Sequence, residues 1–86
     1  MAKMQEMSRR KKRQPDAQRF GAVVRELRER QGWTQEDLAE RADMNASYLG
    51  FVERGDNVPS LVIIIQLADG LGVKPEELLR ETMLRK

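Results

Sequence analysis

The stretch TQEDLAERADMNASYLGFVERG, residues 34–55, decides the fold, because it carries the signals of two short helices joined by a tight turn. Thr34 offers a side-chain oxygen as an N-cap, and Asp37 stands three residues later, where a capping box places an acidic residue. Asn45 is a second N-cap, and Gly55 can end the following helix in a left-handed conformation. We therefore predict one short helix that starts after Thr34 and another that runs from Asn45 to Gly55.

Three further helices are predicted around this pair. Pro15 suits the first turn of a helix that ends near Gly32, and its apolar stripe is Phe20, Val23, Val24 and Leu27. Ser60 caps a fourth helix, and Pro75 begins a fifth. The sequence therefore predicts an all-α domain of five helices over residues 15–86.

The segment VIII at residues 62–65 is β-branched throughout and would favour a strand if taken alone. We interpret it as helix, because Ser60 is a cap and a helical wheel gathers apolar residues on one side. The residues expected to face inward are Leu61, Ile64, Ile65, Ala68 and Leu71. The same wheel turns Val62 and Ile63 outward, where a lone domain would carry charge.

The composition excludes several classes of function. The 86 residues include no cysteine and no histidine, so disulfides, Cys or His metal ligands and nucleophile–histidine pairs are excluded. We expect no enzyme activity and no cofactor. No apolar run approaches the length of a membrane span, and we expect a cytoplasmic protein.

Positive charge is concentrated at the N-terminus. Residues 1–14 hold six basic side chains against one acidic, whereas the rest of the chain holds ten against thirteen. We expect residues 1–14 to be a disordered arm, either a solubilising leader or a segment that neutralises phosphates. Its candidate phosphate contacts are Arg9, Arg10, Lys11, Lys12 and Arg13.

The second helix of the pair has an unusual outward face. Leu49 and Val52 mark its buried side, which leaves the opposite side to Ser47, Gly50, Phe51 and Arg54. A solvated helix normally shows Glu, Lys or Gln on that side. This small, mostly uncharged face with one aromatic ring indicates close approach to a partner.

Residues 34–55 resemble the helix-turn-helix of the phage repressor and Cro family, also called the XRE family. The resemblance covers roughly residues 20–80 and includes Gln35 opening its helix, the small Ala39 at the helix crossing and the closing Glu53-Arg54-Gly55. It implies a regulator of transcription that binds double-stranded DNA, with the helix from Asn45 to Gly55 in the major groove. The DNA contacts that it implies are Thr34, Gln35, Asn45, Ala46, Ser47, Tyr48, Gly50, Phe51 and Arg54.

The resemblance also implies individual roles. Gln35 would donate to a phosphate, Arg54 would reach the DNA backbone, and Phe51 would contact a thymine methyl group. Arg28 and Glu53 match positions where the family commonly holds an ion pair. Trp33, just before the helix-turn-helix, is expected in the core.

Other interpretations of these residues stay open. Phe51 could instead pack on Tyr48 or join a protein interface, and the alternative function is a protein-interaction module, an antitoxin or adaptor. Asp43 stands where the family usually has glycine, and the body after residue 14 is acidic, so the arm or a second subunit must supply much of the attraction to phosphates.

A homodimer on a palindromic operator is the expected assembly. Its expected interface is Val62, Ile63, Met83 and Leu84. The chain resembles both the short controller proteins of restriction–modification systems and small prophage repressors, and its length does not separate them.

Overall fold

The computed structural model describes residues 14–85, so the basic residues predicted for the arm, Arg9 to Arg13, lie outside the described residues. Helices α2 (Pro15–Arg30), α3 (Gln35–Arg41), α4 (Ala46–Arg54), α5 (Leu61–Leu71) and α6 (Pro75–Leu84) follow one another. No strand occurs within residues 14–85. For the part of the chain that the structure describes, the predicted all-α architecture of five helices is confirmed, and residues 62–65 are helical.

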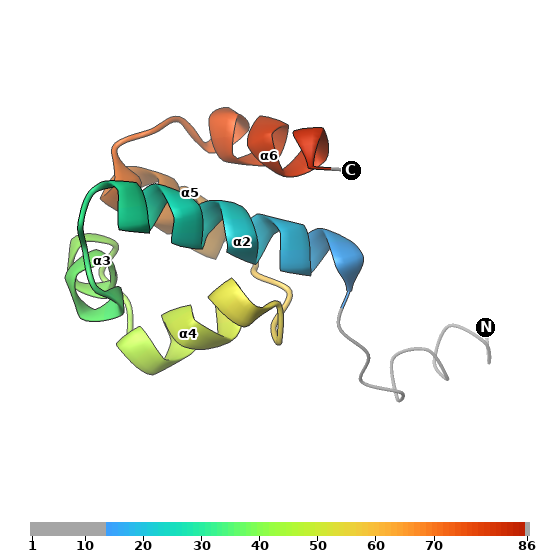
Figure 1. The fold of residues 1–86 in the computed structure, drawn as a ribbon. Helices are drawn as coiled ribbons and strands as arrows, with labels where there is room; N and C mark the ends of the chain where they lie inside the picture. The colour runs from blue at the N-terminus through green and yellow to red at the C-terminus, as the bar shows by residue number, and fades with distance from the viewer. Residues whose placement is uncertain (1–13, 86) are drawn as a thin grey trace.

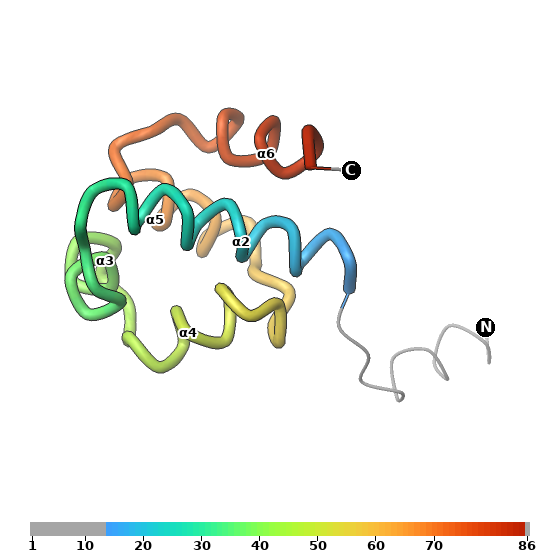
Figure 2. The backbone as a smooth tube through the Cα atoms, in the orientation of Figure 1, coloured from blue at the N-terminus to red at the C-terminus, as the bar shows by residue number. Residues whose placement is uncertain are grey.

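The helices pack in three groups (Figure 1). Helices α2 and α5 lie in the middle, α6 covers one side of them, and α3 and α4 cover the other. The backbone trace shows that the turn between α3 and α4 is short and that a longer connection leads from the end of α4 to the start of α5 (Figure 2). One face of α4 is therefore pressed against α2, and its other face points away from the body.

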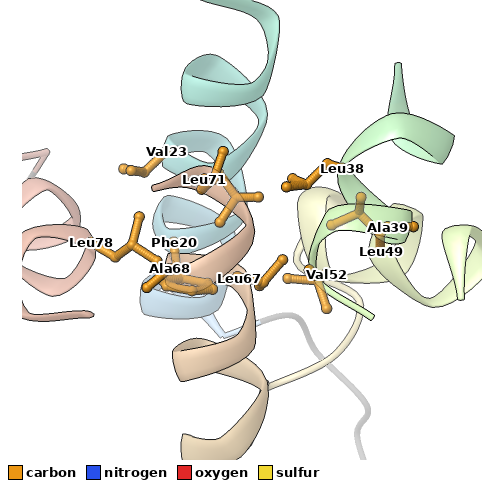
Figure 3. Packing of buried hydrophobic residues seen from close by; sticks show 12 residues of the cluster. Phe20, Val23, Leu38, Ala39, Leu49, Val52, Leu67, Ala68, Leu71 and Leu78 are labelled. Carbon is orange, nitrogen blue, oxygen red and sulfur yellow. The ribbon is translucent and has the colours of Figure 1, made fainter. Parts of the chain in front are cut away.

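One hydrophobic core holds these groups together. Leu78 of α6 enters it from one side, and Leu38, Leu49 and Val52 of α3 and α4 enter it from the other (Figure 3). Each of these four side chains has no exposed surface. Complete burial of a leucine or valine contributes about 1.5–3 kcal/mol. Trp33, which was predicted in the core, packs against its edge and is only partly buried.

The face of α5 that we predicted to be buried is rotated in the structure. Leu61 and Ile65 were expected inward but are exposed, by 69% and 41%, and Ile63 was expected outward but packs against the core. The buried face is centred on Leu67 and Ala68. In a run of five consecutive apolar residues no polar side chain marks the solvent side, so the wheel could not fix the rotation of the first turns.

Gly21 allows α2 and α4 to meet with almost no side chain between them. A Cβ atom added to Gly21 would lie 2.6 Å from the carbonyl oxygen of Glu53 and would also overlap the carbonyl of Val52. No other residue type fits in this space. The contact holds the C-terminal half of α4 against α2 and leaves its opposite face outside.

Candidate nucleic-acid interface

The start of α3 is fixed by a capping box. The backbone N–H of Asp37 donates to Oγ1 of Thr34 over 3.1 Å, and the backbone N–H of Thr34 donates to Oδ2 of Asp37 over 2.9 Å. The backbone hydrogen bond from Thr34, followed by the side-chain one, holds the pKa of Asp37 below its ordinary value. The predicted capping box is confirmed. It uses the side chain of Thr34, which is also among the predicted DNA contacts.

The turn between α3 and α4 is narrow. Asp43 has a φ of 57°, the only positive φ of a residue other than glycine within residues 14–85. This is the left-handed position where the family usually has glycine. Oδ1 of Asn45 accepts from the N–H groups of Ser47 (2.7 Å) and Tyr48 (3.2 Å), which starts α4 as predicted. Both bonds use Oδ1, so the amide nitrogen of Asn45 takes no part in this cap.

A buried ion pair fixes α4 to α2, as predicted. Nε and Nη2 of Arg28 donate to Oε2 and Oε1 of Glu53 over 2.7 and 3.0 Å, and Nη1 donates to the carbonyl of Trp33 over 2.7 Å. The side chain of Glu53 is only 3% exposed. The hydrogen bond to Glu53 raises the pKa of Arg28 further above its ordinary value, so the guanidinium stays charged.

Gln35 belongs to the same network. Its Nε2 donates to Oε1 of Glu53 over 2.9 Å, so the side chain links the start of α3 to the end of α4. The sequence predicted this residue at the helix start but not this bond, which depends on the tertiary packing of α3 against α4. Its proposed hydrogen bond to a phosphate stays a prediction.

The face of α4 that points away from the body carries Phe51, whose side chain is exposed as predicted, with a relative exposure of 44%. Ser47 and Asn45 are also exposed, whereas Ala46 and Tyr48 are partly buried and pack against the core. Tyr48 is therefore only a flanking candidate for DNA contact.

Gly50 corrects one prediction. We expected it to be an exposed position where DNA could come close, but the residue is buried. A Cβ atom added there would lie 3.2 Å from Nη1 of Arg54 and 3.6 Å from Oε1 of Gln35. The absence of a side chain makes room for these two neighbours, because Arg54 folds back along α4 over Gly50.

Arg54 is also held by two other residues. Its guanidinium lies 5.1 Å from the centre of the Phe51 ring, and its Nε donates to Oδ2 of Asp56 over 3.0 Å. Sequence reasoning missed Asp56 entirely. The signal was an acidic residue two positions after the arginine, on the far side of the left-handed Gly55.

Exposed apolar side chains gather on the outer sides of α5 and α6. Of the four residues predicted for the dimer interface, Val62, Met83 and Leu84 are exposed and Ile63 is not. We call the exposed set the α5–α6 apolar surface, and its members are Val58, Leu61, Val62, Ile65, Leu79, Met83 and Leu84. A shallow groove of about 360 Å³ adjoins it, between the start of α2, Pro59 and Met83.

No group of three or more acidic residues within residues 14–85 is arranged to hold a metal ion. None of the described helices is both long and apolar enough to cross a membrane.

Comparisons with known proteins agree with this geometry. The family model described as a helix-turn-helix domain matches residues 19–81. The restriction-modification controller protein C.AhdI from Aeromonas hydrophila is 46% identical, with a TM-score of 0.71 over 73% of this chain and 96% of that chain. The control protein C.BamHI from Bacillus amyloliquefaciens is 36% identical over 66 residues, which is 76% of this chain and 82% of that protein.

A further relative is the uncharacterized HTH-type transcriptional regulator YazB from Bacillus subtilis. It is 38% identical over 63 residues, which is 73% of this chain and 91% of that protein. The matched residues contain the capped helices α3 and α4, the buried Arg28–Glu53 pair and the exposed face of α4. This chain belongs to the helix-turn-helix family of DNA-binding transcription regulators.

Proposed function

We propose that this chain is a cytoplasmic, sequence-specific regulator that binds a palindromic operator as a homodimer and serves as the controller protein of a restriction–modification system. The likenesses to C.AhdI and C.BamHI support the controller role over that of a prophage repressor. The single observation that carries sequence-specific binding is the outward face of α4. That face exposes a phenylalanine on a helix that the Arg28–Glu53–Gln35 network holds rigidly.

The roles on this face follow from groove chemistry. A thymine places its methyl group in the major groove, and an aromatic side chain recognises it by apolar contact, which is the role we assign to Phe51. Ser47 and the amide nitrogen of Asn45 supply polar contacts beside it. Gln35 and the free N–H groups at the start of α3 meet the phosphate backbone.

Electrostatics gives the basic arm a role in this proposal. The chain after residue 14 carries three more acidic than basic side chains, so it attracts phosphates weakly by itself. Each phosphate that the arm neutralises would steepen the salt dependence by about 0.9 in the slope of log affinity against log salt.

The α5–α6 apolar surface supports the homodimer. Dimers in this fold place two recognition helices about 34 Å apart, one turn of DNA, so that each reads half of a palindrome. Leu61 and Val62 of the described surface are large apolar side chains that a monomer would leave in water.

Selection of tight binders from random duplex DNA at moderate salt tests the function. We expect a palindrome with half-sites one helical turn apart and with thymine at a fixed position, and we expect Phe51→Ala to abolish that thymine preference. Gln35→Ala is the matched variant, and it should weaken all sequences similarly. If the folded protein enriches no sequence, the alternative of an antitoxin or adaptor that binds protein through Phe51 takes its place.

A further inference from the structure

The position of Arg54 differs from that of an arginine that only reaches the DNA backbone beyond the end of its helix. Arg54 is the last residue of α4, but its guanidinium lies over Gly50 and Phe51, nearly one turn back toward the helix start. Side chains in helices tilt in this direction, and the bare Gly50 removes the obstacle on the way. The guanidinium therefore lies on the outward face of α4 beside the Phe51 ring, where base edges would be in the proposed complex.

Two contacts restrict the guanidinium to this place. Oδ2 of Asp56 accepts a hydrogen bond from Nε over 3.0 Å, and the guanidinium lies over the Phe51 ring, 5.1 Å from its centre. A cation near an aromatic ring is attracted to the ring face. The bond to Asp56 uses Nε and leaves the two terminal nitrogens of Arg54 as a pair of donors.

A pair of guanidinium donors is the group that matches guanine in the major groove. Guanine presents O6 and N7 side by side as acceptors, and a bidentate arginine is the commonest specific contact to it. Successive bases along a strand are about 3.4 Å apart, so groups separated by 5.1 Å on one helix face can reach neighbouring base pairs.

We propose that Arg54, positioned by Asp56 and by the bare Gly50, reads a guanine in the base pair next to the thymine that Phe51 contacts. This inference rests on the proposed function and adds a second base to each half-site. Gly50 and Asp56 are positioning residues in it, and neither needs to touch DNA. The resemblance implied that Arg54 contacts the DNA backbone. In this proposal Arg54 instead determines which DNA sequence the protein prefers.

The test measures base preference rather than affinity. From the selected operator, four duplexes are made that differ only in the base pair next to the thymine. Each is titrated with the wild-type protein, Arg54→Lys, Asp56→Asn and Gly50→Ala, after the fluorescence of Trp33 has verified that each variant unfolds at a similar temperature. Arg25→Lys is the matched control, because Arg25 pairs with Glu29 on the exposed side of α2.

We expect the wild-type protein to prefer guanine by roughly 5- to 150-fold, the range that a good bidentate pair gives. Arg54→Lys keeps the charge but loses the pair of guanidinium donors, so the preference for guanine should disappear. Asp56→Asn and Gly50→Ala should reduce it, because each frees or displaces the guanidinium. Arg25→Lys should leave it unchanged.

Two results would overturn the inference while leaving the proposed function standing. One is a wild-type operator with no guanine beside the thymine, and the other is an Arg54→Lys variant that weakens all four duplexes by the same factor. If the wild-type protein selects no sequence at all, the proposed function itself fails and the inference falls with it.

Discussion

Replacing Arg28 by methionine removes the positive half of the buried ion pair while keeping most of the volume of its aliphatic stem. Glu53 then loses hydrogen bonds of 2.7 and 3.0 Å and keeps only the one from Gln35, and the carbonyl of Trp33 loses its donor. With 3% of its side chain exposed, Glu53 cannot recover these bonds from water. We expect Arg28→Met to lower the free energy of unfolding by about 3–5 kcal/mol, the loss typical of a broken buried pair.

The size of this loss can be measured by guanidinium denaturation. Trp33 is the only tryptophan of the chain and lies partly buried under the guanidinium of Arg41, so its fluorescence reports unfolding. A small domain has about 5–15 kcal/mol of stability in total, so the variant should unfold at a much lower denaturant concentration. Arg25→Met is the control, since the exposed pair of Arg25 with Glu29 should contribute about 1 kcal/mol or less.

A double variant separates the attraction within the pair from the burial of an unpaired charge. In Arg28→Met with Glu53→Leu no charge is left without a partner, and buried pairs replaced by apolar residues are often neutral in stability. Most of the lost stability should therefore return, whereas DNA binding should not, because Gln35 has lost its acceptor. A loss below about 1 kcal/mol in the single Arg28→Met variant would refute the reasoning, because that is the value of a solvated pair.

Two other predictions concern stability against pH and assembly. Because the pKa of Asp37 is lowered in the folded state, its contribution is complete above its unfolded value of about 3.9 and is lost as the pH falls through the lower folded value. Asp37→Asn should thus lower the denaturation midpoint at pH 7 but have the midpoint of the wild type at a pH below the folded pKa of Asp37. Glu40→Gln on the same helix is the control. A variant that loses the same amount of stability at both pH values would contradict the pKa shift. Leu61→Glu with Val62→Glu should convert dimers to monomers in sedimentation experiments, because two buried carboxylates would face each partner; dimers that persist would place the interface away from the start of α5.

Helix boundaries were predictable because their signals are local. An N-cap such as Thr34, Asn45 or Ser60 binds backbone groups two or three residues away, and all three do so in the structure. The sequence neighbourhood contains everything that this interaction needs. The ion pair between Arg28 and Glu53 spans 25 positions, and only the family resemblance predicted it.

The rotation of α5 was not predictable on the same terms. A wheel identifies the buried face from the contrast between apolar and polar residues, and the sequence from Leu61 to Ile65 has no such contrast. Leu67 and Gly70 fix the rotation in the structure, because Gly70 lies against Ala42 of the α3 end, where a Cβ atom would be 2.9 Å from that of Ala42. Such a close approach depends on how two helices pack together, so it cannot be predicted from the sequence of either helix alone.

The same distinction between local and tertiary signals applies to the outward face of α4. The exposure of Phe51 could be predicted from a helical wheel alone, because Leu49 and Val52 mark the buried side of the same helix. The place of Arg54 follows from three conditions that a wheel does not contain: an empty position at Gly50, a chain reversal at Gly55 and a carboxylate at Asp56.

The inner and outer faces of α4 have different surroundings, and under the proposed function this separation allows the helix to be fixed in place while its outer face reads bases. On the inner face, backbone contact at Gly21 and the ion pair of Arg28 with Glu53 fix the helix against α2, and Glu53 also accepts a hydrogen bond from Gln35, the residue proposed to meet a phosphate. On the outer face, Phe51 and Arg54 are exposed, so we expect substitutions there to change the proposed base preference while the fold is retained. Single variants that break the Arg28–Glu53 pair should therefore lower stability and affinity together, whereas variants of the outer face should change sequence preference at nearly constant stability.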